Sequence, residues 1–436
     1  MKRKDVFKQI IAEFHQWSFP KVLNRDIELP LNTGKIVSLI GVRRSGKTYI
    51  MFQTIKKLLG SVPIEKILYL NFEDERLDMS SYKSTMPQDL GLILEAYKEL
   101  YPNISLSDVY IFFDEIQNIE GWEKFVRRVY DKYTKNIYIT GSNSKLLSKE
   151  IATALRGRTL TYEVFPLTFK EFLTFRGFYF EEIDFYNIEK RAILRKEFLD
   201  YLYYGAFPEV VFFDDKILKL KTLQNYFEVM FYRDLVERYK IKNHIALKYF
   251  IKRLLENVGK MLSVNNIFNE LKSQGYRIAK DSLYEYLEML QDVYFLFVVK
   301  KYNKSILKSE FQRKVYAVDN GLLNALSFSF KEHMGTLLEN AVVKEFLVRD
   351  YNIFFFKEKK ECDIIACHDK NCIPIQITYE MSLYKTKQRE IEGILEASKY
   401  LGSKEGIILT LDEKDELTID GIDIKVLPAY YYLLFY

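Results

Sequence analysis

Residues 41–48 of this 436-residue chain read Gly-Val-Arg-Arg-Ser-Gly-Lys-Thr, and this stretch decides the fold of the N-terminal part. It fits the pattern GxxxxGK[ST], follows the apolar run 35–40 and opens a helical pattern over residues 48–59. The two glycines let backbone N–H groups face phosphate oxygens, and the helix N-terminus adds partial positive charge. We therefore expect a phosphate-binding loop in which Lys47 reaches the β- and γ-phosphates and Thr48 binds Mg²⁺.

The sequence around this loop alternates short apolar runs with amphipathic helical stretches. The runs cover residues 35–40, 66–72, 109–114, 136–140 and 159–165. Strands that are apolar on both faces and are joined by helices are typical of a parallel sheet covered by helices. We predict one α/β domain of the P-loop class over residues 1–165.

A second motif follows from the run 109–113, which ends in Asp114 and Glu115. At a strand end beside a phosphate loop, Asp114 is expected to hold the Mg²⁺ shell and Glu115 to polarise the attacking water. A carboxylate pair at a strand end can also be a helix N-cap. The adjacent glutamate favours nucleotide hydrolysis, and the sequence has no N-K-x-D guanine motif, so ATP is the expected substrate.

The run 136–140 ends in a third polar segment, where Ser142 or Asn143 could orient the water. The alternative is a plain turn. Arg158, or Arg156, could reach the γ-phosphate bound by a neighbouring subunit, which implies a homo-oligomer. The alternative for these arginines is a pair of surface charges. The predicted ATP-binding residues are Gly41, Arg43, Arg44, Ser45, Gly46, Lys47 and Thr48.

Composition and charge limit the remaining choices. No run of 18 or more apolar residues exists to span a bilayer, and three cysteines cannot form a disulfide framework. We therefore expect a cytoplasmic protein without a membrane partner. The net charge is +5, but residues 241–320 alone hold 14 Lys and Arg against 8 Asp and Glu. A basic segment suggests DNA as a partner, and a solvated lysine-rich surface is the alternative.

The pattern after residue 165 predicts a helical lid or linker over 166–240 and a winged helix-turn-helix over 241–325. The latter comprises three helices, near 245–258, 264–271 and 279–290, followed by a β pair with a lysine-bearing loop. The third helix also carries Asp281, Glu285 and Glu288, which would repel a phosphate backbone. The predicted DNA contacts are Lys280, Lys300, Lys301, Lys304 and Lys308.

The order of the motifs is similar to that of a prokaryotic group of AAA+ class P-loop ATPases with a C-terminal domain of unknown function. The resemblance rests on GVRRSGKT, LNFEDERL, VYIFFDEIQNIEGW, IYITGSNSKLL, LRGRT and FPLTFKEFL, and continues with YFEVMFYRDLVERYKI, VYAVDNGL, GTLLENAVVKEFL and IPIQITYEM. It therefore covers almost the whole chain. It implies an ATPase domain, a winged helix and, over residues 326–436, a restriction-endonuclease-like α/β domain.

Such a nuclease fold needs an acid on a helix, an aspartate on a strand and an acid-x-lysine pair on the next strand. Here Glu339, Asp363 and Gln376 stand at the first three positions, and Thr378 stands where the lysine is expected. Lys357 or Lys385 could substitute for it. We expect a nuclease-like domain that is degenerate. The nearby Cys362, Cys367 and Cys372 do not have zinc-ligand spacing.

Three functions remain open from the sequence. The first is an ATPase that acts on nucleic acid, the second is an ATP-gated switch or scaffold for protein partners, and the third is an ATP-dependent nuclease. The expected cofactors are ATP and Mg²⁺ in all three.

Overall fold

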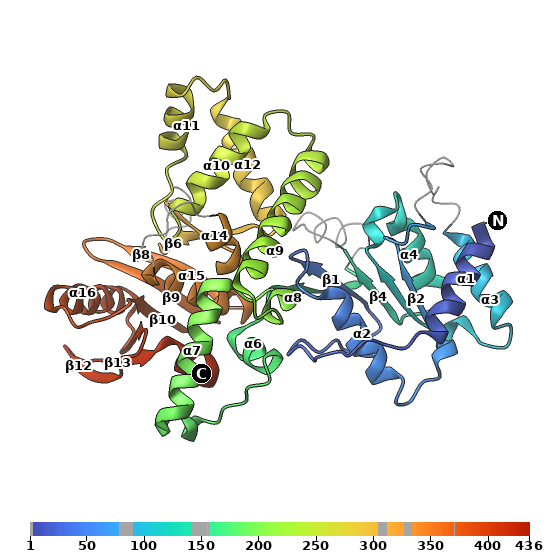
Figure 1. The fold of residues 1–436 in the computed structure, drawn as a ribbon, viewed down its shortest axis with the longest axis horizontal. Coiled ribbons are helices and arrows are strands. Elements are labelled where there is room, and N and C mark those ends of the chain that lie inside the picture. The colour runs from blue at the N-terminus through green and yellow to red at the C-terminus, as the bar shows by residue number, and fades with distance from the viewer. Residues whose placement is uncertain are drawn as a thin grey trace. The chain divides into compact units, whose positions relative to one another are not determined.

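The computed structural model describes residues 3–77, 90–141, 155, 157–303, 312–326, 334–369 and 371–436. The chain divides into two compact units, Met1–Phe165 and Pro166–Tyr436 (Figure 1). The boundary between the two units, after Phe165, lies where the sequence predicts the end of the ATPase domain. The three segments predicted after it form one unit, and their finer division stays a prediction.

The first unit is built on a five-stranded parallel sheet. Its strands are ordered β2-β3-β4-β1-β5, and all four neighbouring pairs are parallel. Each predicted apolar run forms one strand, which confirms the α/β prediction for this unit. The strands are β1 (Ile36–Gly41), β2 (Ile67–Asn71), β3 (Tyr110–Asp114), β4 (Ile137–Thr140) and β5 (Thr159–Val164).

The helices of the first unit connect and cover these strands. Helix α4 lies between two of the predicted strands, as the alternation of apolar runs and helical stretches predicts, and it buries Trp122, Phe125, Val126 and Val129. The helices are α1 (Arg3–Gln16), α2 (Lys47–Leu58), α3 (Gly91–Leu100) and α4 (Trp122–Lys132), with short 3₁₀ turns η1 (Ile64–Lys66), η2 (Leu106–Asp108) and η3 (Ile116–Asn118).

Aromatic side chains join α1 and α2 to the sheet. Phe14 of α1 stacks on Tyr69 of β2 with ring centroids 4.8 Å apart, and Phe52 of α2 lies 5.4 Å from the same ring. All three residues are buried. Because aromatic burial stabilises a core strongly, α1 is an integral part of this unit and fixes the position of Tyr69.

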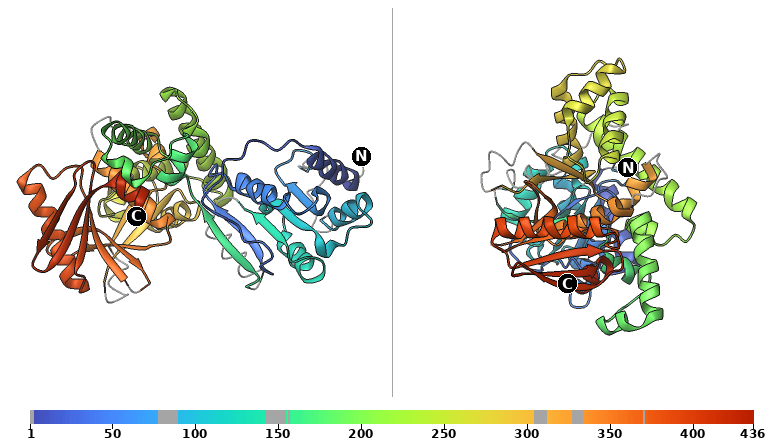
Figure 2. Two further views of the ribbon diagram at one scale, coloured as in Figure 1. Left: turned by 90° about the horizontal axis from the view of Figure 1, so that it is seen from below. Right: turned by 90° about the vertical axis from the view of Figure 1, so that its left-hand side faces the viewer.

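The second unit begins with helices and ends in a sheet. Figure 2 shows the yellow helices α10–α12 standing together away from the orange and red strands of the same unit. Its helices are α6 (Phe169–Phe175), α7 (Ile188–Tyr204), α8 (Pro208–Val211), α9 (Lys216–Val229), α10 (His244–Glu256), α11 (Val264–Ser273), α12 (Lys280–Asp292), α14 (Asn320–Leu326), α15 (Met334–Val348), α16 (Tyr384–Leu401) and α17 (Ala429–Phe435), with a 3₁₀ turn η4 (Glu182–Tyr186) and a π-helix η5 (Met230–Glu237).

An eight-stranded mixed sheet completes the second unit, in the order β12-β13-β11-β10-β9-β8-β6-β7. The hairpin predicted as a wing, β6–β7, joins this sheet because β6 pairs in parallel with β8. The predicted winged helix and the predicted end domain therefore share one sheet. The strands are β6 (Leu296–Lys301), β7 (Arg313–Ala317), β8 (Asn352–Lys357), β9 (Glu361–His368), β10 (Asn371–Ile377), β11 (Glu405–Thr410), β12 (Asp415–Ile419) and β13 (Ile422–Pro428).

A buried polar network fixes the start of the second unit to α15. The Lys344 ammonium donates to the Leu167 carbonyl and, at 3.0 Å, to the Tyr201 hydroxyl. The Glu345 carboxylate accepts from the Phe169 N–H at 2.7 Å and from the Tyr201 hydroxyl. Buried polar groups are stable only when they are hydrogen-bonded, so this network determines how the chain leaves residue 166.

A disulfide bond that the sequence did not predict links β9 to β10. Cys367 and Cys372 lie opposite each other in the β9–β10 ladder and form this bond, whereas Cys362 is a buried free thiol. No helix among the described residues is long and apolar enough to cross a membrane.

We predict that Lys344→Met destabilises the second unit by about 2–3 kcal/mol, because it removes charged hydrogen bonds from buried acceptors. Thermal and denaturant unfolding of the purified chain measure the change. The control is Lys399→Met, which removes only an exposed ion pair with Asp420 and should cost less than about 1 kcal/mol. Equal losses in the two variants would contradict the importance of the network.

Candidate nucleotide site

The loop between β1 and α2 is shaped by two glycines. Gly41 has φ 130°, and a Cβ there would lie 2.2 Å from the Val164 carbonyl oxygen of β5. Gly46 has φ 94° and precedes the first residue of α2. Only glycine tolerates both the close approach and the positive φ, so these positions set the path of the loop.

The polar groups of the loop are suited to an anionic ligand. The Lys47 ammonium donates to the Gly41 and Val42 carbonyls at 3.2 and 2.9 Å, so it lies folded over its own loop. The Ser45 hydroxyl is buried and has no hydrogen-bond partner in the described part of the chain. A buried hydroxyl without a partner costs free energy, which a phosphate oxygen would recover. These residues fit the phosphates of a nucleotide.

The Asp114 carboxylate at the end of β3 organises the site. It accepts hydrogen bonds from the hydroxyls of Thr48 at 2.8 Å, Tyr69 at 3.0 Å and Thr140. Since these donors come from α2, β2 and β4, one buried carboxylate joins three elements of the unit. Thr48 and Asp114, the predicted Mg²⁺ ligands, are in direct contact.

Burial raises the pKa of the Asp114 carboxyl above its ordinary value, and the hydrogen bonds from Thr140, Thr48 and Tyr69 oppose this shift. Burial likewise raises the pKa of the Tyr69 hydroxyl. The charged form of Asp114 is therefore held at an energetic cost inside the protein. A divalent cation beside this carboxylate would offset that cost, and Thr48 and Asp114 fit Mg²⁺ in this respect.

Glu115, the predicted base, has an unusual backbone conformation. Its φ is 53°, in the left-handed region that residues other than glycine seldom adopt. Its N–H donates to the Thr140 hydroxyl at 2.8 Å, and its carboxylate accepts from the Gln117 amide at 2.6 Å. Strained residues held by surrounding contacts are frequent at functional sites. Thr140 thus positions both acids, a role that the sequence did not reveal.

Arg25 is a further residue that sequence reasoning missed. Its buried guanidinium donates to the Ser45 carbonyl at 2.7 Å and to the Phe165 carbonyl at 3.0 Å. It therefore connects the phosphate loop to the last residue of the unit. A single arginine in the irregular segment before β1 gave no pattern from which this role could be inferred.

The other predicted nucleotide-site residues lie in different surroundings. Arg44 is exposed, and Arg43 lies 3.8 Å from the Glu73 carboxylate. Arg158 precedes β5 and pairs with Asp131 at 3.2 Å. Its carbonyl accepts from the N–H of Ile36, the first residue of β1, so Arg158 lies at the opposite end of the strands from the phosphate loop, about 17 Å away along β1. At this distance the Arg158 guanidinium does not reach a nucleotide bound by the loop of the same chain. Ser142, Asn143 and Arg156 lie outside the described residues.

The predicted DNA contacts are less concentrated than the sequence suggests. Lys280 lies over the Tyr284 ring of α12, and Lys301 pairs with Glu358 at 2.9 Å. Lys300 is exposed in β6, and Lys304 and Lys308 lie outside the described residues. The exposed face of α12 carries the three acids noted in the sequence.

The nuclease-like residues of the second unit come together, with a lysine that the sequence did not indicate. Glu339 of α15 and Asp363 of β9 lie 3.6 and 3.8 Å from the ammonium of Lys314, which comes from β7. Although burial opposes it, the carboxylates of Glu339, Asp363 and Glu361 raise the pKa of Lys314. Within the described ranges, no three His, Cys, Asp or Glu side chains are arranged to hold a metal ion.

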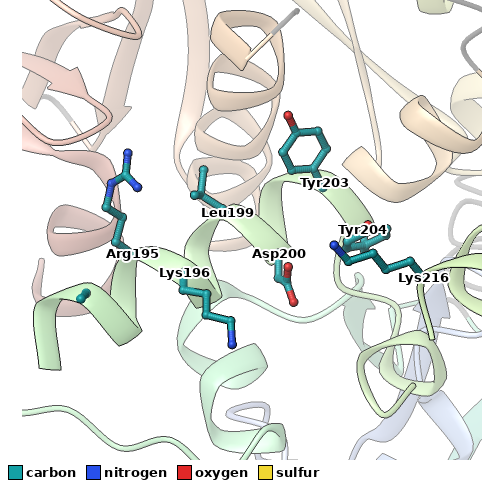
Figure 3. Close-up of a pocket in the computed structure, with 8 residues that line it drawn as sticks. Arg195, Lys196, Leu199, Asp200, Tyr203, Tyr204 and Lys216 are labelled. Carbon is teal, nitrogen blue, oxygen red and sulfur yellow. The ribbon is translucent and has the colours of Figure 1, made fainter. Parts of the chain in front are cut away.

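A pocket of about 540 Å³ lies on the outer side of α7, at the start of α9 (Figure 3). Its charged lining residues are Arg195, Lys196, Asp200 and Lys216, and Arg195 is bonded to Asp412 at 2.6 Å. Tyr203 and Tyr204 complete the polar lining. No hydrogen bond joins any two of these lining side chains, all of which belong to the described part of the chain, so no nucleophile in the pocket is paired with a bonded base.

We predict that Arg25→Met weakens ATP binding about tenfold or more and lowers the unfolding temperature, because two buried carbonyls lose their donor and the loop loosens. Fluorescence titration with labelled ATP and thermal unfolding measure the two effects. Lys21→Met, at an exposed position in the same segment, is the control and should change neither. Unchanged ATP affinity in Arg25→Met would show that Arg25 does not position the loop.

Two parts of the chain match known families. Residues 33–173 match the family described as "AAA domain", and residues 195–333 match the "Domain of unknown function (DUF8612)". Among solved structures, the Aeropyrum pernix ORC1 protein in complex with DNA aligns with 74% of this chain and 91% of its own, at 14% identity and a TM-score of 0.31. Similarity at this level says nothing about function.

Relatives cover the chain from end to end. The "Uncharacterized protein MJ1544" of Methanocaldococcus jannaschii is 37% identical over 449 residues, which span 100% of this chain and 96% of that protein. A Haemophilus influenzae protein is 31% identical over 399 residues, which span 89% of this chain and 92% of that protein. These findings confirm the resemblance inferred from the motifs. The chain therefore belongs to a prokaryotic family of proteins that combine an AAA domain with the C-terminal domain of unknown function DUF8612.

Proposed function

We propose that this protein is a Mg²⁺-dependent ATPase that couples ATP hydrolysis to nucleic-acid binding or remodelling. The observation that carries the proposal is the contact between the Thr48 hydroxyl and the Asp114 carboxylate, with Glu115 as the next residue. Phosphate loop, metal-binding acid and candidate base meet where parallel strands end, as ATP hydrolysis by this class of domain requires.

In the proposed mechanism, the loop N–H groups and Lys47 bind the phosphates of ATP. Thr48 and Asp114 would hold Mg²⁺, which would neutralise charge on the phosphate oxygens. Glu115 accepts a proton from a water molecule while the water oxygen attacks the γ-phosphorus. The bond between that phosphorus and the bridging oxygen breaks, so that ADP and inorganic phosphate leave. Gln117 keeps the Glu115 carboxylate oriented through their hydrogen bond of 2.6 Å.

The remaining predicted site residues have accessory roles in this proposal. Ser142 or Asn143 would orient the water from the segment after β4. Arg158, or Arg156, would act on ATP bound by a neighbouring subunit, since Arg158 lies at the sheet edge away from its own loop. That role requires a homo-oligomer in which Arg158 exchanges Asp131 for a phosphate oxygen.

Support for the nucleic-acid part comes from charge. Residues 241–320 carry a net charge of +6, and the element order from α10 to β7 is that of a winged helix. Lys300 and the lysines of the β6–β7 connection are better candidates for phosphate contacts than α12, whose exposed acids repel a polyanion. A cytoplasmic location is consistent with these partners.

A switch that binds protein partners is the second candidate. The acids of α12 favour it, because a helix with Asp281, Glu285 and Glu288 exposed is better suited to a basic protein surface than to DNA. The pairing of Lys301 with Glu358 removes one more cation from DNA contact.

We predict that Glu115→Gln retains ATP binding but lowers the hydrolysis rate at least about 100-fold, because the amide cannot accept the proton. Equilibrium ATP binding and phosphate release are measured on the same preparation. Glu120→Gln, an exposed acid five residues further on, is the matched control. Normal turnover in Glu115→Gln would refute its assignment as the base.

Nucleic-acid coupling predicts that double- or single-stranded DNA stimulates ATP hydrolysis at low salt, and that the stimulation falls steeply as salt rises. The rate is measured at several salt concentrations with and without each DNA. A rate that is indifferent to both DNAs, together with nucleotide-dependent association of the chain, would favour the protein-binding switch.

A further inference from the structure

Three carboxylates of the second unit converge on one buried ammonium. The Lys314 ammonium lies 2.9 Å from Glu361, 3.6 Å from Glu339 and 3.8 Å from Asp363. Only 2% of the Lys314 side chain is exposed. The lysine comes from β7, whereas the acids come from α15 and β9, so the cluster joins segments that are far apart in the sequence.

Further donors reach the same carboxylates. The Glu339 oxygen that faces Lys314 also accepts from the Tyr316 hydroxyl at 2.7 Å, and the second oxygen of Asp363 accepts from the Ile377 N–H at 3.0 Å. The second oxygen of Glu361 accepts from Lys357 at 2.8 Å. The carboxylates are therefore held by several donors in addition to Lys314.

Gln376, the third predicted nuclease-like residue, is hydrogen-bonded to β9 and α16 and not to Lys314. Its carbonyl accepts from the Asp363 N–H at 3.0 Å, and its amide donates to Glu390 of α16. Gln376 thus positions the backbone of β9. Its carbonyl oxygen is not directed to a ligand.

A metal-dependent nuclease of this fold directs its acids at a divalent cation, and Mg²⁺ requires oxygen ligands at about 2.0–2.1 Å in octahedral geometry. Here the acids instead surround an ammonium, which supplies one positive charge and N–H donors at longer distances. The residues present do not fit a Mg²⁺ ion while Lys314 lies among them.

We propose that the Lys314 ammonium takes the place of the divalent cation in this nuclease-like fold, so that the second unit binds no metal there. In this proposal the unit has a nuclease-like architecture and lacks metal-dependent phosphodiester cleavage. The inference does not depend on the proposed ATPase activity.

The cluster has a structural role in this account. Gly259, which follows α10, has φ 76°, and a Cβ there would lie 2.7 Å from the second oxygen of Glu339. Its N–H donates to the Val315 carbonyl of β7 at 3.1 Å. The backbone before α11 therefore passes close to Glu339, the same carboxylate that bonds Tyr316 of β7 after α12.

The test is a Mn²⁺ titration of the full chain without nucleotide, followed by electron paramagnetic resonance. Wild type and Asp363→Asn should give the same titration up to about 1 mM Mn²⁺. Lys314→Met, which removes the ammonium and keeps the length of the side chain, should gain one Mn²⁺ per chain and a higher unfolding temperature in its presence. Lys357→Met, which removes the outer partner of Glu361, should gain neither.

A Mn²⁺ ion bound by wild type and lost in Asp363→Asn would overturn the proposal, as would a Lys314→Met chain that folds and gains no site. Metal-dependent DNA cleavage by wild type that is lost in Asp363→Asn would overturn it too. If Lys314→Met does not fold, the comparison of wild type with Asp363→Asn and Glu339→Gln decides: identical titrations support the proposal, and a site lost in either variant refutes it.

Discussion

The structure of the first unit depends on one buried carboxylate. Asp114 accepts hydroxyl hydrogen bonds from α2, β2 and β4, and so it fixes the phosphate-loop helix relative to the sheet. Tyr69 reaches it because the aromatic contacts with α1 and α2 hold that ring. The acid that is proposed to bind Mg²⁺ is thus also the centre of the local hydrogen-bond network. A change in the charge of Asp114 would alter its hydrogen bonds to Thr48 and Thr140. Because Thr140 also accepts from the Glu115 N–H, the change would reach Glu115 as well.

The connection between the two units is fixed at each of its ends. Arg25 holds the Phe165 carbonyl and the Ser45 carbonyl within the first unit. Lys344 holds the Leu167 carbonyl within the second. Only Pro166 lies between, and its ring restricts the backbone there. Pro166 alone therefore separates the last anchored carbonyl of the first unit from the first anchored carbonyl of the second.

Sequence patterns predict the parts of this protein that follow local rules. The spacing of residues 41–48, the five apolar runs and the helical pattern over residues 48–59 are properties of continuous segments, and the structure confirms these elements. The sequence also shows that Thr378 stands where a nuclease would have a lysine. The structure supplies what those patterns do not contain: Arg25, Tyr69, Thr140 and Lys314 are single polar residues that act through long-range contacts. Lys314 in particular lies 49 positions before Asp363, on a strand predicted to belong to a wing.

In the second unit, the predicted winged helix and the predicted end domain are joined through one sheet. Strand β6 pairs with β8, and Lys314 of β7 is buried among the acids of α15 and β9. The hairpin β6–β7 therefore lies at one edge of a large sheet. Its position in the sequence, directly after three helices, is what predicts a wing, and the domain boundaries within this unit stay predictions.

The measurement that tests the central claim most directly is the ATP dissociation constant with and without Mg²⁺, for wild type and for Asp114→Asn. Our account predicts that Mg²⁺ tightens ATP binding about tenfold or more in wild type and has little effect in Asp114→Asn, because the amide carries no charge for the cation. Equal tightening in both proteins would contradict the role assigned to Asp114, and with it the proposed nucleotide site.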